Sequence, residues 1–495
     1  MALDQGTTGS RAILFDKDGK IACSAYREIE QIYPQPGWVE HNPEEIWQSV
    51  IGCVKEVLDR SGAGPQDVAG IGITNQRETT ILWDKTTGRP LYNAIVWQCR
   101  RTAPTCEELI RRGLDGEVRD RTGLMIDPYF SATKIMWLRD NVAGVRERIE
   151  RGEVCAGNVD SWLIWNLTGG KAHVTDYSNA SRTMLFNVKD LRWDDVLLRE
   201  TGIPEGIMPQ PRPSSGIFGH TDEAVFFGAR VPIAGVAGDQ QSALFGQACF
   251  EPGMIKNTYG TALVAIMNIG DRFIPSRNRL MTDLAWGLEG KITYAFEGVV
   301  FSGGAVVQWL RDGIRIIEKA SDTESLANKV ADTGGVYIVP AFTGLCSPYW
   351  DPYARGTIVG LTRGTSREHL ARAALESIAY QTRDIIEAMV SDSGRELTSL
   401  RVDGGATVND FLMQFQADIL GVPLEKPLVI EMTGLGAAYL AGLGTGFWEN
   451  KGELARLWKL GRVFEPRMSE DRRETLYQGW KKAVERSFGW AKNSI

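Results

Sequence analysis

Four short stretches of the sequence combine charged or hydroxyl side chains with residues that favour turns. The first, DQGTTGSR, places Asp4, Thr7, Thr8 and Arg11 around one turn. A turn of glycine and hydroxyl residues can present N–H groups and hydroxyls to a phosphate. Asp4 could hold Mg²⁺ directly or through water, and Arg11 could contact a phosphoryl group during transfer. Taken alone, the stretch fits an ordinary hairpin turn about equally well.

Two further stretches place small or acidic residues directly after apolar runs. In VAGDQQSALFGQ, Asp239 follows an apolar run that predicts a strand. At the edge of a cleft this carboxylate could take a proton from a substrate hydroxyl, but an aspartate here could instead cap the following helix. In DGGATVND, Gly404 and Gly405 stand at a strand-to-helix turn, where a nucleotide could approach the backbone. A tight turn without a ligand explains these glycines as well.

The fourth stretch, TNQRETT, places a cation and an anion side by side at a polar turn. Vicinal hydroxyls need both hydrogen-bond donors and acceptors, so Arg77 and Glu78 suit a polyol. A solvated surface ion pair is the commoner interpretation of such a dipeptide. Trp97 and Tyr129 could pack on a sugar-like carbon chain, although isolated aromatic residues more often belong to the core.

Helix caps and turn residues locate some of the elements that must position these side chains. HNPEEIWQSVIGCVKEVLDRSG predicts a helix that Asn42 caps and that ends before Gly62. A second helix, REHLARAALESIAYQTRDIIEAMV, follows a capping box predicted for Thr365 and Glu368. Strands are predicted around the opening turn, around the Arg77-Glu78 turn, and before Asp239 and Gly404.

The chain is predicted to consist of two α/β halves, residues 1–249 and 250–495. After FEPG, at residues 250–253, the sequence restarts with an apolar strand, a Gly-Thr turn at Gly260 and Thr261, and another apolar strand. This order resembles the start of the chain. A length of 495 residues also exceeds what one domain usually holds.

Composition excludes several classes of protein. The net charge of −7 argues against nucleic acid or an anionic membrane as the main partner. The longest apolar stretch, near Gly434, is far shorter than the roughly 20 residues of a membrane span. Seven cysteines without a C-x-x-C pair predict reduced thiols and a cytoplasmic enzyme. Four scattered histidines make a histidine-based metal site unexpected.

The motifs taken together resemble the FGGY carbohydrate kinases of the actin/Hsp70/hexokinase superfamily. The similar segments run nearly from end to end and include LDQGTTGSRA, GITNQRETT, VTDYSNASRTMLFN, AGDQQSALFGQ, NTYGT and LGAAYLAG. Both family signatures are present, as YFSATKIMWL and GLTRGTSREHLARAALE. The resemblance implies two ribonuclease H-like domains, as in actin-like ATPases, which flank a catalytic cleft and close over the substrates.

Within this family the sequence is most similar to members that phosphorylate glycerol. The resemblance implies transfer of a phosphoryl group from ATP to glycerol, with Mg²⁺, giving ADP and sn-glycerol 3-phosphate in glycerol catabolism. Asp239 matches the family's general base. Residues matched to glycerol binding are Arg77, Glu78, Trp97, Tyr129, Asp239 and Gln240. Residues matched to the nucleotide are Thr7, Thr8, Arg11, Gly260, Thr261, Gly304, Gln308, Gly405 and Asn409. Asp4 and Asp239 match the Mg²⁺ site. A cytoplasmic homodimer or homotetramer is expected.

Two alternatives remain at this point. The chain could phosphorylate another polyol or sugar, although the Arg-Glu pair with Trp97 and Tyr129 favours glycerol. It could instead be an ATP-binding protein of the same fold without catalysis, which the retained Asp4, Arg11 and Asp239 argue against.

The sequence departs from the family pattern at several positions. Ala262 replaces a glycine beside the phosphates, and Val264 replaces a phenylalanine that usually flanks the glycerol carbons. Cys346 and Ser347 stand where glycine and alanine are usual. Val225 occupies the place of a regulatory histidine, so phosphorylation there is not expected. Gly228 and Arg230 match residues that bind the inhibitor fructose 1,6-bisphosphate in some relatives, which leaves that inhibition open.

The first strand is expected to be short. Only Met1, Ala2 and Leu3 precede Asp4, whereas the family has several apolar-rich residues there. We therefore expect the natural chain to begin several residues earlier and the strand as given to hold the opening turn less firmly.

Overall fold

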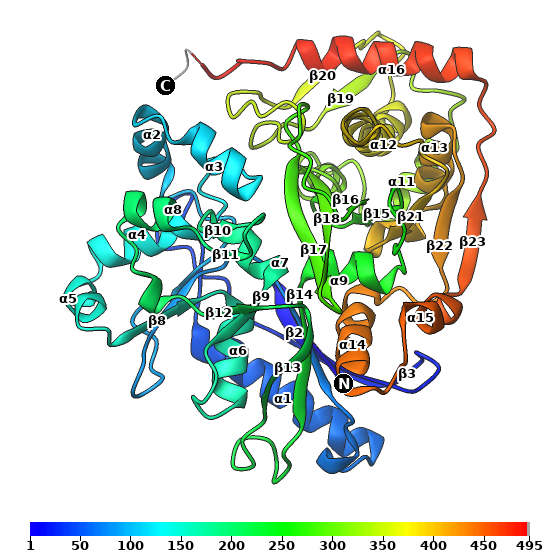
Figure 1. Ribbon diagram of the computed structural model, residues 1–495. Helices are drawn as coiled ribbons and strands as arrows, with labels where there is room; N and C mark the ends of the chain where they lie inside the picture. The colour runs from blue at the N-terminus through cyan, green and yellow to red at the C-terminus, as the bar shows by residue number, and fades with distance from the viewer. Residues whose placement is uncertain (493–495) are drawn as a thin grey trace.

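Two large sheets form the framework of the computed structural model, which describes residues 1–492 (Figure 1). The N-terminal sheet has six strands in the order β13 (Ser215–His220), β14 (Pro232–Gly238), β5 (Ile71–Asn75), β1 (Ala2–Gln5), β2 (Gly9–Phe15) and β3 (Ile21–Glu28). The C-terminal sheet has seven strands in the order β17 (Met281–Leu288), β18 (Lys291–Val300), β16 (Leu263–Gly270), β15 (Ile255–Tyr259), β21 (Leu400–Asp403), β22 (Leu424–Pro427) and β23 (Leu460–Phe464).

The two sheets repeat one topology. Strand β1 pairs antiparallel with β2 and parallel with β5, which is parallel to β14. Strand β15 likewise pairs antiparallel with β16 and parallel with β21, which is parallel to β22. An antiparallel strand lies at the far edge of each, β13 beside β14 and β23 beside β22. Each sheet thus begins with a hairpin whose turn contains Gly-Thr, as the sequence predicted, and the predicted α/β fold class is confirmed.

Strand β1 is four residues long and lies inside its sheet. Asp4 is opposite Arg11 of β2 on one side and Thr74 of β5 on the other. Ala2 and Leu3 are fully buried. The opening turn therefore follows a strand that is paired along both edges.

Local sequence signals set the ends of the first helix. Helix α1 (Pro43–Ser61) begins after Asn42, whose side chain accepts a hydrogen bond from the Glu44 N–H at 3.0 Å. Gly62 ends it in the left-handed region, with φ of 73°. The predicted start and end are confirmed.

The predicted cap of the long helix α12 (Arg367–Ser393) is wrong by one residue. Its N-cap is Ser366 rather than Thr365, and the partner in the capping box is His369 rather than Glu368. The Ser366 N–H donates to His369 Nδ1 at 3.2 Å. Thr365 instead accepts from the Thr362 N–H through its hydroxyl, at 2.9 Å, so it belongs to the preceding turn.

Two helices lie between the sheets and join them. Helix α9 (Asp239–Gly246) follows β14 and also contacts β15 and β16, while α14 (Met432–Thr445) comes from the C-terminal half and covers β14 and β5 (Figure 1). Glycine permits their close crossing. A Cβ atom on Gly436 would lie 1.8 Å from the Ser242 carbonyl oxygen, and one on Gly246 would lie 2.1 Å from the Met432 carbonyl oxygen.

Helices α1 and α6 (Val159–Leu167) pack on the N-terminal sheet, and α12 and α13 (Asp410–Leu420) pack on the C-terminal sheet. Farther out, the C-terminal half carries α16 (Glu470–Glu485). The N-terminal half carries α2 (Ala103–Arg111) and α4 (Ser131–Asn141) farther out. Several of these helices belong to residues 76–214, which the chain inserts between β5 and β13. This insertion supplies part of the candidate site.

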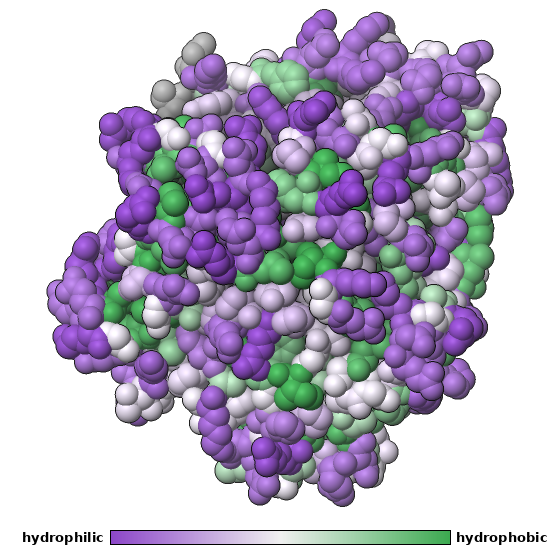
Figure 2. All heavy atoms as spheres, in the orientation of Figure 1, coloured by the Kyte–Doolittle hydropathy of each residue, from purple (hydrophilic) through white to green (hydrophobic). Residues whose placement is uncertain are grey.

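The surface in view is mostly hydrophilic, with small and separate hydrophobic areas (Figure 2). Among residues 1–492, no helix combines the length and the apolar composition that a membrane crossing requires. All seven cysteines are free thiols, and six of them are buried.

Candidate active site

Arg77 lies at the turn after β5, and most of its N–H groups are engaged. Its Nε lies 3.1 Å from Asp239 Oδ1. Its Nη1 donates to Gln241 Oε1 at 3.1 Å and also contacts Glu297 Oε2. Its Nη2 donates to Glu297 Oε1 at 3.0 Å. One N–H of Nη2 has no acceptor within residues 1–492, so it remains available to a bound molecule.

Glu78 occupies the left-handed region with φ of 59°, which is uncommon outside glycine and often marks a functional position. Its carbonyl oxygen accepts from Lys134 Nζ at 3.2 Å, which helps to hold this backbone. Its Oε1 accepts from Arg182 Nε at 2.6 Å, and Oε2 has no donor among the described residues. Burial raises the pKa of Glu78, and the Arg182 guanidinium opposes that shift.

The predicted aromatic residues form one wall of the same site. The rings of Trp97 and Tyr129 pack edge to face, with centroids 5.6 Å apart. The Arg182 guanidinium lies 5.3 Å from the centre of the Tyr129 ring. The indole Nε1 of Trp97 donates to Thr7 Oγ1 at 2.9 Å, so this wall also contacts the opening turn.

Asp239 is the first residue of α9 and is partly exposed at the cleft, with 32% of its side chain accessible. Its Oδ1 accepts from the Gln240 N–H at 2.7 Å and faces Arg77, while Oδ2 has no donor within residues 1–492. The Gln240 side chain accepts from Lys256 Nζ through Oε1, at 2.5 Å. Its amide nitrogen is therefore left to donate elsewhere.

Side-chain and backbone groups from three segments hold the opening turn. Besides Trp97, the amide of Gln31 donates to the Thr7 carbonyl oxygen at 2.9 Å. The Gln76 amide donates to the Gly6 carbonyl oxygen at 3.3 Å. The Ile29 N–H donates to the Thr8 carbonyl oxygen at 3.1 Å. The turn is thus fixed by the segment after β3, by the Arg77 turn and by Trp97.

Asp4 and Arg11 lie side by side beneath the opening turn. Burial raises the pKa of Asp4 to about 7; Arg11 opposes this shift, and the negative charges of Asp239 and Glu431 add to it. Arg11 pairs with Glu431 at the start of α14. No donor within residues 1–492 contacts the Asp4 carboxylate. The carboxylates of Asp4 and Asp239 supply oxygen ligands of the kind that Mg²⁺ prefers. This ion usually binds one or two carboxylates and completes its coordination with water and phosphate oxygens.

The second Gly-Thr turn is held by backbone hydrogen bonds. The Gly260 N–H donates to the Ala262 carbonyl oxygen at 3.0 Å, which closes the turn. Gly303 and Gly304 donate to the carbonyl oxygens of Thr261 and Gly260, both at 2.9 Å. Thr261 is exposed and lines a cavity of the C-terminal half.

A cavity of about 420 Å³ in the C-terminal half collects all six of the nucleotide residues predicted there. Gly405 stands at the turn after β21, and Asn409 caps α13 by accepting from the Leu412 N–H at 2.9 Å. The six residues that line the cavity are Gly260, Thr261, Gly304, Gln308, Gly405 and Asn409.

Comparison with known proteins decides the family. Residues 1–246 match the FGGY family of carbohydrate kinases, N-terminal domain, and residues 255–445 match its C-terminal domain. The chain belongs to the FGGY carbohydrate kinases. It is 62% identical to a curated glycerol kinase of Caldanaerobacter subterraneus subsp. tengcongensis over 491 residues, which cover 99% of each chain.

Solved structures of FGGY carbohydrate kinases share the fold. The crystal structure of Plasmodium falciparum glycerol kinase with ADP superposes with a TM-score of 0.92 at 37% identity, over 98% of this chain and 97% of that one. A ligand-bound xylulose kinase of Lactobacillus acidophilus superposes at 0.88, with 22% identity over 99% of both chains, and supports the fold alone. The predicted two-domain actin-like kinase fold is confirmed.

The residues that depart from the FGGY pattern lie in different surroundings. Val264 is half-buried on β16, directly opposite Thr258 of β15 and Val299 of β18, and so shares their face of the sheet. Ala262 closes the second Gly-Thr turn with its carbonyl oxygen. Cys346 and Ser347 are buried and do not line the cavity of about 420 Å³.

The sequence analysis missed four charged residues that the fold brings to this kinase site. Arg182 contacts Glu78, Glu297 contacts Arg77, Asp283 contacts Arg182, and Lys256 contacts Gln240. All four are buried. Arg182 lies within the quoted motif VTDYSNASRTMLFN, and Lys256 directly precedes the quoted motif NTYGT, so their positions beside family motifs were a signal. Asp283 and Glu297 stand in strand sequences without a comparable motif.

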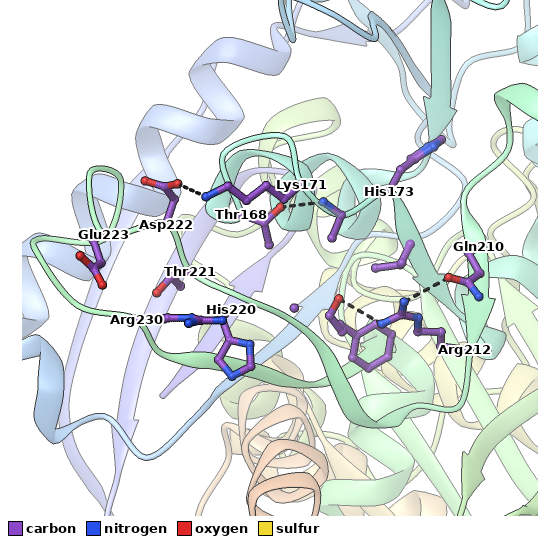
Figure 3. Close-up of a pocket in the computed structure, with 14 residues that line it drawn as sticks. Thr168, Lys171, His173, Gln210, Arg212, His220, Thr221, Asp222, Glu223 and Arg230 are labelled. Carbon is purple, nitrogen blue, oxygen red and sulfur yellow. Dashed lines mark hydrogen bonds and ion pairs between the residues drawn. The ribbon is translucent and has the colours of Figure 1, made fainter.

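A separate cavity of about 730 Å³ lies in the N-terminal half, away from this site (Figure 3). Its basic residues are largely engaged with their neighbours. Lys171 donates to Asp222 at 2.7 Å, and Arg212 donates to Gln210 at 3.1 Å. Arg230, which the resemblance matched to inhibitor binding in some relatives, also lines this polar cavity.

Proposed function

We propose that this chain is a glycerol kinase that transfers the γ-phosphoryl group of ATP to glycerol and releases ADP and sn-glycerol 3-phosphate. The observation that carries the proposal is the open oxygen of Asp239. The other oxygen of this carboxylate is held by Arg77 Nε at 3.1 Å and by the Gln240 N–H at 2.7 Å, whereas Oδ2 has no donor within residues 1–492. The full-length identity of 62% to a glycerol kinase supports the same substrate.

Glycerol is held by a donor, an acceptor and an apolar wall. The free N–H of Arg77 donates to one hydroxyl, and Glu78 Oε2 accepts from another. The edge-to-face pair of Trp97 and Tyr129 covers the carbon chain, and the Gln240 amide nitrogen donates from the opposite side. Because every buried hydroxyl needs a partner, this arrangement selects a small polyol.

Asp239 acts as the general base. Hydrogen bonds from Gln240 and Arg77 fix Oδ1, and so Oδ2 points to the substrate hydroxyl. The hydroxyl proton moves to Oδ2 as the glycerol oxygen forms its bond to the γ-phosphorus. The bond from that phosphorus to the β,γ-bridging oxygen breaks, and ADP leaves with the electron pair.

The two Gly-Thr turns bind the phosphates from opposite halves, with Thr7, Thr8 and Arg11 on one side and Gly260 and Thr261 on the other. The cavity of about 420 Å³ binds the rest of the adenine nucleotide. Asp4 and Asp239 would hold Mg²⁺, which when bound neutralises charge on the phosphates.

The proposal includes several expectations from the sequence. The halves divide at residues 249 and 250, where the chain passes from the α9 segment to β15; the last three residues lie outside the described part. A cytoplasmic homodimer or homotetramer acting in glycerol catabolism is proposed, and the seven free thiols fit a reducing compartment.

An assay for ADP release tests the function. The purified chain with ATP and Mg²⁺ is supplied in turn with glycerol, erythritol, xylulose, gluconate or no acceptor. We expect rapid ADP release with glycerol and slow release with the others. ADP release that favours xylulose or gluconate would make the chain a different FGGY kinase. ADP release that no acceptor stimulates would refute kinase activity on these substrates.

A further inference from the structure

A buried cluster of charges connects the glycerol residues to the opposite half of the molecule. At its centre is Arg182, which is fully buried in the short turn Ser181–Thr183. Its Nε donates to Glu78, and its Nη1 donates to Asp283 Oδ2 at 2.7 Å. Its Nη2 lies 3.1 Å from Glu297 Oε1. That same oxygen accepts from Arg77, so Glu297 joins the two arginines.

The two carboxylates come from neighbouring strands of the C-terminal sheet. Glu297 of β18 is directly opposite Met281 of β17, and Asp283 is opposite Ala295. Directly opposite residues share a face, and so do residues two apart on one strand. Asp283 and Glu297 therefore project from one face, and they meet Arg182 and Arg77 of the N-terminal half. The side chains of both carboxylates are 0% exposed.

We propose that Asp283 and Glu297 are positioning residues for glycerol: acting through Arg182 and Arg77, they fix the acceptor of Glu78 and the donor of Arg77 from across the boundary between the halves. The proposal rests on the proposed glycerol kinase function and adds residues from the nucleotide-binding half to its substrate site.

The geometry explains what each carboxylate does. Arg77 Nε lies 4.0 Å from Glu78 Oε1 and 3.1 Å from Asp239 Oδ1, so two other carboxylates compete for its charge. Glu297 holds the far end of the Arg77 guanidinium with two contacts. Without that charge, Arg77 would turn towards Glu78 and occupy the acceptor that glycerol needs.

Asp283 has the same role for Arg182. The Arg182 guanidinium has to stay in place beside Glu78 Oε1 and over the Tyr129 ring. Asp283 binds the opposite edge of that guanidinium and prevents it from rotating. Burial by itself would raise the pKa of Glu297, yet Arg182 and Arg77 hold it below the ordinary value, which supports an ionised Glu297.

A purely structural role predicts a different result from a positioning role. Neutralising a buried ion pair that only stabilises the fold lowers the melting temperature and changes both substrates alike. Neutralising Asp283 or Glu297 should instead weaken glycerol selectively, because their partners contact glycerol and not ATP. Calorimetric binding of glycerol measures this without turnover.

The test compares Asp283→Asn and Glu297→Gln with Asp384→Asn. Asp384 is a buried carboxylate of the same half that accepts hydrogen bonds from Tyr477 and Trp480 at 2.6 and 2.8 Å. Neither partner belongs to the proposed glycerol site. We expect Asp283→Asn and Glu297→Gln to raise the KM and Kd for glycerol about tenfold or more, with KM for ATP changed less than about twofold. Asp384→Asn should lower the melting temperature and leave both KM values within about twofold.

Charge-retaining variants guard against loss of folding. Glu297→Asp and Asp283→Glu keep the negative charge but change the length of the side chain. They should raise the glycerol KM less than the neutral variants do. Folded variants with an unchanged glycerol KM, or with equal losses for glycerol and ATP, would overturn the proposal. A wild-type chain that binds no glycerol by calorimetry would refute the proposed function itself, whereas failure of the variants alone leaves it standing.

Discussion

In the proposed site, Glu78 supplies the acceptor and Arg77 the donor that bind the hydroxyls of the polyol. Glu78→Gln replaces the carboxylate with an amide, so the oxygen that glycerol uses becomes weaker or is lost as an acceptor. Leaving a buried hydroxyl without its partner costs about 1–3 kcal/mol. We expect the glycerol KM to rise and the ATP KM to change little, and Arg77→Ala should act in the same direction. Equal effects on both substrates would move the pair out of the glycerol site.

We propose that Val264 faces the glycerol site and leaves room there that a larger side chain would fill. It shares a sheet face with Thr258 and Val299, and two residues along those strands the same face carries Lys256 and Glu297, which contact glycerol residues. Each added methylene buried against glycerol is worth roughly 0.8 kcal/mol. Val264→Phe should therefore lower the glycerol KM several-fold, and Val264→Leu should have a smaller effect. An unchanged or higher KM with both would show that this side chain does not face glycerol.

Residues with a local signal could be predicted from the sequence, and residues defined by distant contacts could not. Asp239, Arg77 and Gly260 stand at turns next to apolar strands, and the family motifs include them. Glu297 contacts Arg77 although the two residues are 220 positions apart in the chain. The residues next to each of them in the sequence give no indication of that contact. The alternative that Asp239 only caps a helix was wrong, because the N-cap of α9 is Gly238 and the only backbone N–H from which the Asp239 carboxylate accepts is that of the next residue.

At the scale of elements, the crossing of α9 and α14 fixes how the halves meet. Gly436→Ala would place a methyl group 1.8 Å from the Ser242 carbonyl oxygen, so backbone has to shift. Overpacking of this kind costs about 1–3 kcal/mol. We expect a lower melting temperature and reduced turnover, because α9 carries Asp239.

Gly116→Ala is the matched control for that variant. Gly116 lies in helix α3 (Asp115–Thr122), where an added Cβ would contact nothing within 4 Å. Alanine in a helix is favoured over glycine by about 0.5–1 kcal/mol, so stability should rise slightly and turnover should stay unchanged. Equal melting temperatures for both variants would contradict the close-crossing account.

Element boundaries were predictable where caps are local. Asn42 and Gly62 set the start and the end of α1 without long-range contacts, since each bonds to backbone groups within four residues. The cap of α12 was misplaced because Thr365 and Ser366 are both hydroxyl residues, and His369 rather than Glu368 supplies the partner. The packing of α14 against the opposite sheet is a long-range contact that no local pattern indicates.

At the scale of the whole molecule, one buried carboxyl makes stability depend on pH. Asp160 of α6 accepts from Thr175 at 2.6 Å, and burial raises its pKa to about 7. Between the ordinary pKa of about 4 and pH 7, the folded chain holds a proton that the unfolded chain has lost, so stability falls as pH rises. The part due to Asp160 amounts to up to about 2.7 kcal/mol between pH 5 and 7.

Asp160→Asn isolates that contribution because asparagine does not titrate. Urea unfolding of both proteins at pH 5 and pH 8 gives the difference in unfolding free energy at each pH. We expect the free energy of unfolding of the variant, relative to that of the wild type, to be higher at pH 8 than at pH 5. A difference that is the same at both pH values would show that Asp160 is ionised in the folded protein throughout this range.

The central claim is that Asp239 takes the proton from glycerol, and one measurement tests it most directly. The rate of glycerol 3-phosphate formation is compared between the wild type and Asp239→Asn at saturating ATP and glycerol, with ATP binding measured for both. Loss of a general base costs about 10²–10⁴ in rate. We predict a fall of that size with ATP binding close to normal. A variant that retains more than roughly a tenth of the wild-type kcat would contradict the account.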